Sequence, residues 1–224
     1  MFVPPTADAL LEARRRLAAA DPALAALEAV TPPFEWRVST GGFPGLLKMV
    51  VQQQVSLASA AAIWARVEAG LPEMTPDAVM GHEDAYLLSL GLSRPKARYV
   101  RAIAHAHLAG TCDFDALPGL SDEEAIAALT AITGIGRWTA EVYLMFTQGR
   151  LDMFPGGDIA LQEAMRWADR SALRPTEKQA YIRAERWAPH RSVAAHLLWG
   201  WYGAVRRGEV ALEQATLEQA REGR

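Results

Sequence analysis

The chain of 224 residues lacks several features that define whole classes of protein. Cys112 is its single cysteine, which excludes intramolecular disulfides, and no Cys-x-x-Cys pair is present to hold zinc or an iron–sulfur cluster. No apolar run reaches the roughly 18 to 20 residues that a membrane-spanning helix needs. The N-terminus also lacks a basic start followed by an apolar stretch, so we expect no export signal and a cytoplasmic location.

The chain also lacks an excess of charge of one sign. Its formal net charge is -3, half of its residues are hydrophobic and 22% are charged. This balance excludes a disordered chain and suits one compact protein or two packed lobes. Because no global positive charge exists, any surface that binds nucleic acid must be basic or polar only locally.

Hydrophobic residues recur at helical spacing along nearly the whole chain, and no stretch shows the strict alternation of a strand. We therefore predict an all-α fold. The expected helices span about 6–20, 22–30, 43–55, 57–67, 76–80, 84–90, 95–108, 121–131, 138–148, 159–167, 175–187, 191–206 and 209–222.

Two of these helices flank a short glycine-containing turn, Thr133-Gly134-Ile135-Gly136-Arg137. This arrangement is a helix–hairpin–helix. Glycines open turn conformations that other residues avoid and let main-chain amides approach an outside group closely. Amides at a helix N-terminus bind phosphate well, so such a hairpin can hold a nucleic-acid backbone without a strongly basic protein. The alternative is a plain connection between two antiparallel helices.

Asp158 follows Gly156-Gly157 and opens a predicted helix. Taken alone, this position indicates an ordinary N-cap residue. A helix N-terminus also favours the ionised carboxylate by up to about 2 kcal/mol. An anion near a sugar C1′ would stabilise oxocarbenium character or orient an attacking water, as carboxylates do in glycoside hydrolysis. Capping and catalysis are compatible in one residue.

Three separated blocks in matching order carry a family resemblance: VVQQQVS at 50–56, TGIGRWTAEVYLMF through FPGGD at 133–158, and RWAPHRSVAAHLLW at 186–199. Together they resemble the helix-hairpin-helix-Gly/Pro-Asp DNA glycosylases, in particular the 3-methyladenine DNA glycosylase II branch. The similarity covers about residues 43–201. The first 40 residues predict only helices, whereas some relatives carry a small β-sheet domain before the helical core.

The resemblance implies a set of DNA contacts. Asp158 would be the catalytic carboxylate, and Gln53 and Gln54 would fill the gap left by a flipped nucleotide, although a polar helix junction is the alternative for this pair. The phosphate contacts would come from Gly134, Gly136, Arg137 and Thr139. Main-chain carbonyls of the hairpin would hold a structural cation, here those of Thr130, Ile132 and Ile135.

The same resemblance places aromatic residues near the base. Trp138 and Trp199 would line the base pocket, with core packing as the alternative, and Val142 stands where some relatives carry a pocket tyrosine. Bifunctional glycosylase/lyases carry a lysine where this chain has Trp138. The densest basic cluster fits phosphate contacts or a solvated helix face equally well and comprises Arg94, Lys96, Arg98 and Arg101.

These observations predict a monofunctional DNA glycosylase that needs no cofactor for catalysis and acts, as a monomer, on duplex DNA with alkylated bases. We expect two helical lobes with the hairpin and Asp158 at their junction. One lobe would span about 45–148, including the hairpin at 133–137, and the other about 1–44 plus 150–224. The alternatives are a helix–hairpin–helix module that only binds DNA and a bifunctional glycosylase/lyase.

Overall fold

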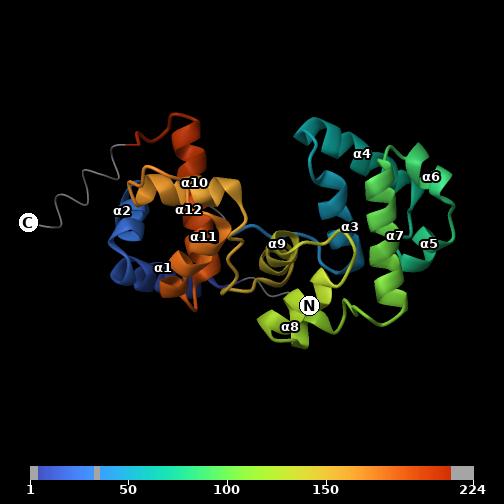
Figure 1. Ribbon diagram of the computed structural model, residues 1–224, viewed down its shortest axis with the longest axis horizontal. Coiled ribbons are helices and arrows are strands. Elements are labelled where there is room, and N and C mark those ends of the chain that lie inside the picture. Colours follow the sequence, from blue (N-terminus) through green and yellow to red (C-terminus); the bar gives the residue numbers. More distant parts are fainter. Residues whose placement is uncertain (1–4, 33–35, 213–224) are drawn as a thin grey trace, which may run out of the picture. The chain divides into compact units, whose positions relative to one another are not determined.

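The computed structural model describes residues 5–32 and 36–212 (Figure 1). Every regular element within these ranges is a helix and none is a strand, which confirms the all-α prediction. In the same ranges, no helix combines the length and the apolar character needed to cross a membrane.

The described residues divide into two compact units. The first, which we call the central unit, is Ser39–Gln148. It contains α3 (Gly42–Gln52), α4 (Leu57–Gly70), α5 (Pro76–Met80), α6 (Asp84–Ser89), α7 (Arg94–Leu108), η1 (Leu117–Gly119), α8 (Asp122–Thr130) and α9 (Arg137–Gln148).

The second, which we call the split unit, combines the described residues before Ser39 with those from Gly149 on. It contains α1 (Ala7–Ala20), α2 (Pro22–Val30), α10 (Ile159–Ala168), α11 (Glu177–Ala184), η2 (Glu185–Trp187) and α12 (Arg191–Arg206).

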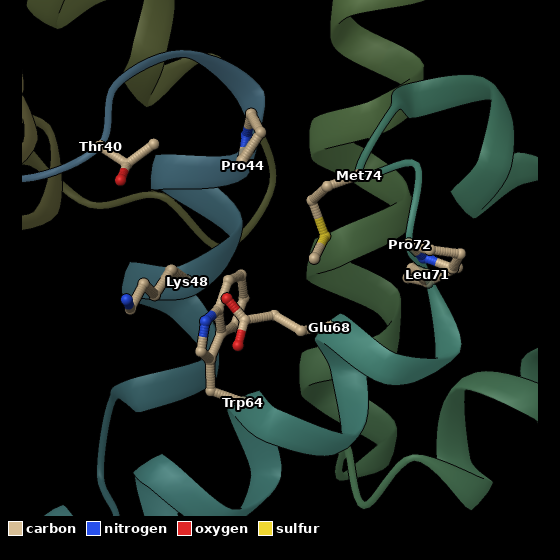
Figure 2. Close-up of a pocket in the computed structure, with 8 residues that line it drawn as sticks. All are labelled: Thr40, Pro44, Lys48, Trp64, Glu68, Leu71, Pro72 and Met74. Atoms are coloured by element: carbon tan, nitrogen blue, oxygen red, sulfur yellow. The ribbon is translucent and has the colours of Figure 1, made fainter.

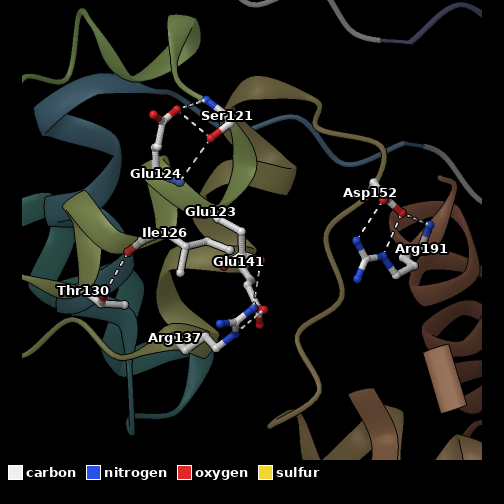
Figure 3. Close-up of polar contacts among 9 residues, drawn as sticks. All are labelled: Ser121, Glu123, Glu124, Ile126, Thr130, Arg137, Glu141, Asp152 and Arg191. Atoms are coloured by element: carbon white, nitrogen blue, oxygen red, sulfur yellow. Dashed lines mark hydrogen bonds and ion pairs between the residues drawn. The ribbon is translucent and has the colours of Figure 1, made fainter. Parts of the chain in front are cut away.

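Short polar side chains start most of these helices, because each accepts a hydrogen bond from an amide that lacks an intrahelical partner. Ser121 and Glu124 form a complete capping box at the start of α8 (Figure 3). The other helices with such a cap begin after Thr6, Asp21, Ser56, Thr75, Ser93, Asp158 and Thr176.

Each unit has its own apolar core. In the central unit α3 packs against α4, α7 and α9 and buries five large side chains, Phe43, Leu46, Leu47, Val50 and Val51. In the split unit α12 packs against α1, α2 and α10 and is buried along most of its length. Full burial of one such side chain contributes about 1.5–3 kcal/mol, so these helices anchor the segments that precede and follow them.

Several helix boundaries differ from the prediction. Helix α4 continues to Gly70, three residues beyond its predicted end. Helix α3 ends at Gln52, because the chain turns sharply through Gln54 before α4 begins. Helix α11 ends at Ala184 and continues as a 3-10 turn to Trp187. The predicted helix at 209–222 is wrong over 209–212, which are not helical, and its remainder lies outside the described residues.

Candidate functional site

The hairpin between α8 and α9 is anchored by two isoleucines. Ile132 and Ile135 are 3% and 4% exposed, and the Ile135 amide donates to the Ile132 carbonyl at 3.0 Å. The glycines on either side of Ile135 are exposed. Burial of the isoleucines therefore holds the turn with its glycine main chain on the surface.

Glycine occupies positions 134 and 136 of the hairpin for different structural reasons. Gly134 has a φ of +92°, and a Cβ built there would lie 2.2 Å from the Tyr99 ring, so the fold itself requires glycine at this position. Gly136 has no such φ, and a Cβ there would meet nothing within 4 Å. The turn conformation therefore requires glycine at Gly134 and not at Gly136. The other predicted role, close approach of an outside group to the main chain, stays a prediction for Gly136.

Helix α9 begins at Arg137, directly after Gly136. The Arg137 guanidinium lies against two carboxylates: Nε donates to Glu141 at 2.9 Å, and Glu123 of α8 is 3.5 Å away (Figure 3). Glu141 is only 2% exposed. Arg137 therefore joins the two helices of the hairpin, in addition to standing at the turn where the sequence predicts a phosphate contact.

Thr139 and Gln53, which the sequence assigns to two separate DNA contacts, are hydrogen-bonded to each other. Gln53 Nε2 donates to Thr139 Oγ1 at 3.0 Å, and Thr139 is 5% exposed. The hydroxyl of Thr139 is therefore used inside the central unit, and its main-chain amide is the group that belongs to the first turn of α9. Gln54 remains exposed beside this contact.

Asp158 is the N-cap of α10 and is half-buried in the split unit. Its Oδ1 accepts from the Leu161 amide at 2.9 Å and from Trp199 Nε1 at 3.1 Å. Two donors on one oxygen fix the orientation of the carboxylate. The sequence predicts the cap, but it does not predict the bond from Trp199, 41 residues further along the chain.

The loop before Asp158 is tied to the start of α12. Asp152 accepts from Arg191 Nε and Nη2, both at 2.8 Å, which is a bidentate pair (Figure 3). The Met153 amide donates to Ser192 Oγ at 2.9 Å. These contacts fix the loop to the helix that also carries Trp199.

Trp199 is half-buried among aromatic and basic side chains that the sequence analysis missed. His196 meets the Trp199 ring edge to face at 6.0 Å, and Trp36 stacks on His196 at 4.1 Å. The Arg37 guanidinium lies 6.0 Å from the centre of the Trp199 ring. Burial lowers the pKa of His196 to about 4, so its imidazole is neutral at physiological pH.

Trp138 and Val142 lie one helical turn apart on α9, in the central unit. Trp138 is half-buried and Val142 is 6% exposed. Residues at this spacing share a helix face, so the two side chains are neighbours on α9.

The three lysines of the chain lie in different environments. Lys48 lines a pocket of about 320 Å³ together with Trp64 and Glu68, and its Nζ lies 5.4 Å from the centre of the Trp64 ring (Figure 2). Lys96 Nζ donates to the Val51 carbonyl at 2.7 Å. Lys178 is exposed on α11. None of the three belongs to the hairpin.

A family model described as "HhH-GPD superfamily base excision DNA repair protein" matches residues 47–190, so the chain belongs to this superfamily. Among curated proteins it is 32% identical over 160 residues to DNA-3-methyladenine glycosylase 1 of Schizosaccharomyces pombe, covering 69% of each chain. It is 29% identical to DNA-3-methyladenine glycosylase 2 of Escherichia coli, covering 80% of this chain and 65% of that protein.

Solved structures agree with this assignment. A DNA-3-methyladenine glycosidase from Bacillus halodurans matches with a TM-score of 0.79 and 30% identity, covering 91% of this chain and 94% of that one. The S. pombe 3-methyladenine DNA glycosylase in complex with abasic DNA matches with a TM-score of 0.74 and 27% identity, covering 90% and 98%.

Proposed function

We propose that the chain is a monofunctional DNA glycosylase that removes alkylated bases such as 3-methyladenine and 7-methylguanine and leaves an abasic site. The proposal rests mainly on the Asp158 carboxylate. Hydrogen bonds from Trp199 and from the first turn of α10 fix its orientation, and the chain belongs to this superfamily. The names of the relatives, which are 3-methyladenine glycosylases, support the substrate class. We further propose that the two units act on one duplex as the lobes of the enzyme.

The hairpin is the proposed binding site for the DNA backbone. Main-chain amides at the start of a helix point outward from its N-terminus and bind phosphate well, and the open space at Gly136 lets a phosphate approach the start of α9. The positive end of the helix dipole favours an anion there. Because this binding depends on main-chain groups, it is compatible with the net charge of -3.

Replacing Gly136 with valine should weaken binding to any duplex about tenfold or more. The added side chain would occupy the space of the phosphate, and the lost bonds to a charged group contribute about 1.5–3 kcal/mol. Phosphate contacts do not read sequence, so the loss should be equal for different sequences. Fluorescence anisotropy with undamaged and abasic duplexes measures it.

Gly119 provides the matched control. It too is exposed, has no left-handed φ and has nothing within 4 Å of an added Cβ, but it lies outside the hairpin. The Gly119→Val variant should bind as the parent does. Equal affinities of the parent and a folded Gly136→Val variant would remove the hairpin from the interface.

Asp158 is the proposed catalytic group. The damaged nucleotide is flipped out of the duplex, and its N-glycosidic bond breaks with the electron pair leaving on the base. The carboxylate stabilises the positive charge that develops at C1′ and orients the water that attacks there. The bond from Trp199 Nε1 keeps the carboxylate in one orientation throughout.

We propose that Trp199 of the split unit, and Trp138 and Val142 of the central unit, each contact the flipped base. Aromatic faces attract a cation by about 0.5–2 kcal/mol, which favours bases that alkylation has made positively charged. Such a base departs as a neutral molecule and needs little help from a general acid. The buried His196 is neutral and its Nδ1 lies 2.7 Å from the Ser192 carbonyl, so we assign it no proton transfer.

Strand cleavage is not expected. A lyase forms a Schiff base through a deprotonated lysine near the sugar, and the bifunctional position holds Trp138 in this chain. We therefore expect borohydride to trap no covalent protein–DNA adduct during base release, as judged by denaturing electrophoresis. A trapped adduct at catalytic enzyme concentration would contradict the monofunctional assignment.

The hairpin carbonyls of Thr130, Ile132 and Ile135 fit the structural cation that the family implies. All three are neutral oxygen donors, which suits a hard cation, and Ile132, which already accepts one hydrogen bond, keeps a second lone pair. Within the described residues no cluster of three His, Cys, Asp or Glu side chains could hold a metal ion. Held there, the cation would supply positive charge that favours a phosphate at the hairpin. A monomeric state and a cytoplasmic location also remain predictions.

A competition between methylated and uracil-containing duplexes tests the substrate class. Under single-turnover conditions, 3-methyladenine and 7-methylguanine should leave much faster than uracil, because only the alkylated bases carry positive charge. Replacing Trp199 with alanine should reduce this preference. Faster removal of uracil would contradict the charged-base argument but not the glycosylase assignment.

A further inference from the structure

The turn that joins α3 to α4 projects an unusual group of side chains. Gln54 adopts a φ of +58°, a left-handed conformation that costs a non-glycine residue about 1–2 kcal/mol. Gln54 is exposed, and so are the apolar side chains of Val55 and Leu57, at 37% and 92%. Strained positions of this kind persist only where the surrounding structure holds them.

Two side chains outside this turn, Thr139 and Lys96, are hydrogen-bonded to it. Thr139 of α9, three residues after Gly136, accepts a hydrogen bond from Gln53. Lys96 of α7 donates to the carbonyl of Val51, in the last turn of α3. The turn is thereby fixed to the hairpin helix and to α7 within the central unit.

The position of Lys96 is unfavourable for its own helix. It lies in the first turn of α7, where the helix dipole disfavours a cation. Burial also lowers the pKa of its ammonium group. At the C-terminus of α3, in contrast, a cation satisfies a carbonyl without an intrahelical partner and complements the dipole. The interaction with α3 therefore explains a lysine at this position.

We propose that Lys96 is a positioning residue for duplex recognition, which holds the Gln54 turn as a preorganised projection into the DNA. The proposal rests on the proposed function. A group already held in its bound conformation avoids the ordering cost of binding, and apolar side chains such as Val55 and Leu57 suit insertion between base steps. The Gln53–Thr139 bond couples this projection to the phosphate-binding hairpin.

A double-mutant cycle on an abasic-site duplex tests this role. Lys96→Met keeps the length of the side chain but removes the donor, and should weaken binding about tenfold. Gln54→Ala removes the projecting side chain. If Lys96 acts through the turn, Lys96→Met should have little further effect in the Gln54→Ala background, because the two changes affect one interaction. Lys96→Arg, which can still donate to the Val51 carbonyl, should recover most of the affinity.

The salt dependence of binding separates positioning from direct phosphate contact. A lysine that contacts phosphate lowers the slope of log K against log salt by about one when it is removed, whereas a positioning residue leaves the slope unchanged. Lys178→Met, which removes one exposed positive charge elsewhere, is the control and should bind as the parent does.

Additive effects in the cycle, a reduced salt slope or unchanged binding by Lys96→Met would each overturn the inference. The cycle measures binding to a product-like duplex and needs no turnover. Its failure is therefore distinct from failure of the proposed function, which would show as absence of base release by the parent protein.

Discussion

Replacing Asp158 with asparagine should slow base excision by about 10² or more, the range expected for one positioned catalytic side chain, and leave DNA affinity nearly unchanged. Asparagine is as good an N-cap as aspartate and can still accept from the Leu161 amide, so α10 should remain folded. Only the negative charge of the carboxylate is lost. Single-turnover release of 7-methylguanine, with anisotropy for binding, measures both quantities.

Asp158→Ser provides a second variant with a good cap and no carboxylate, and should behave like Asp158→Asn. Circular dichroism establishes that both variants are folded. Turnover equal to that of the parent in either variant would show that Asp158 is a structural cap and that another group stabilises the transition state.

The largest expected effect on stability comes from Asp21, between α1 and α2. Asp21 is 2% exposed and accepts from the Trp187 indole at 2.8 Å and from Arg183, which also pairs with Asp169 at 2.9 Å. Burial alone would raise the pKa of Asp21, but the bonds from Arg183 and Trp187 and the Arg183 charge outweigh it and lower the pKa. This network connects α2 to α11 and η2.

Asp21→Ala should therefore lower the free energy of unfolding by about 3–5 kcal/mol at pH 7, because it leaves a buried cation with one partner fewer. The stabilisation is fully present above the unfolded pKa, near 3.8, and is lost as the pH falls through the lower folded pKa. The difference between variant and parent in urea unfolding should thus shrink below about pH 4.

Glu12→Ala is the control for this measurement. It removes the exposed pair between Glu12 and Arg16, which are 52% and 64% exposed, and should leave the free energy of unfolding nearly unchanged, because water screens such a pair. A similarly small loss in Asp21→Ala would mean that the buried network contributes little to the split unit.

Local signals in the sequence predict most of the helices. The predicted N-cap at Asp158 and the predicted start of a helix at about Ser121 each depend on neighbours within a few residues, and the structure confirms both. The sequence does not predict the end of α3, because the turn at Gln54 is held by Lys96 and Thr139, which are distant in the chain.

In the candidate site, too, local signals in the sequence predict some features and long-range contacts determine the others. Motif spacing identifies Asp158 and the hairpin, but it cannot separate the roles of Gly134 and Gly136, because the difference lies in the Tyr99 ring packed against only one of them. Trp36 and His196 give no local signal, since their positions depend on packing around α12. Long-range contacts decide which predicted residues remain available to a ligand.

The most direct test of the account is a panel of duplexes, each with one damaged base, incubated with the parent protein and scored for free base and for abasic sites. We predict that duplexes with 3-methyladenine or 7-methylguanine release the base and become alkali-labile at that position, without strand cleavage by the protein itself. Binding to these duplexes with no release of any base would contradict the central claim and would define a helix–hairpin–helix protein that only binds DNA.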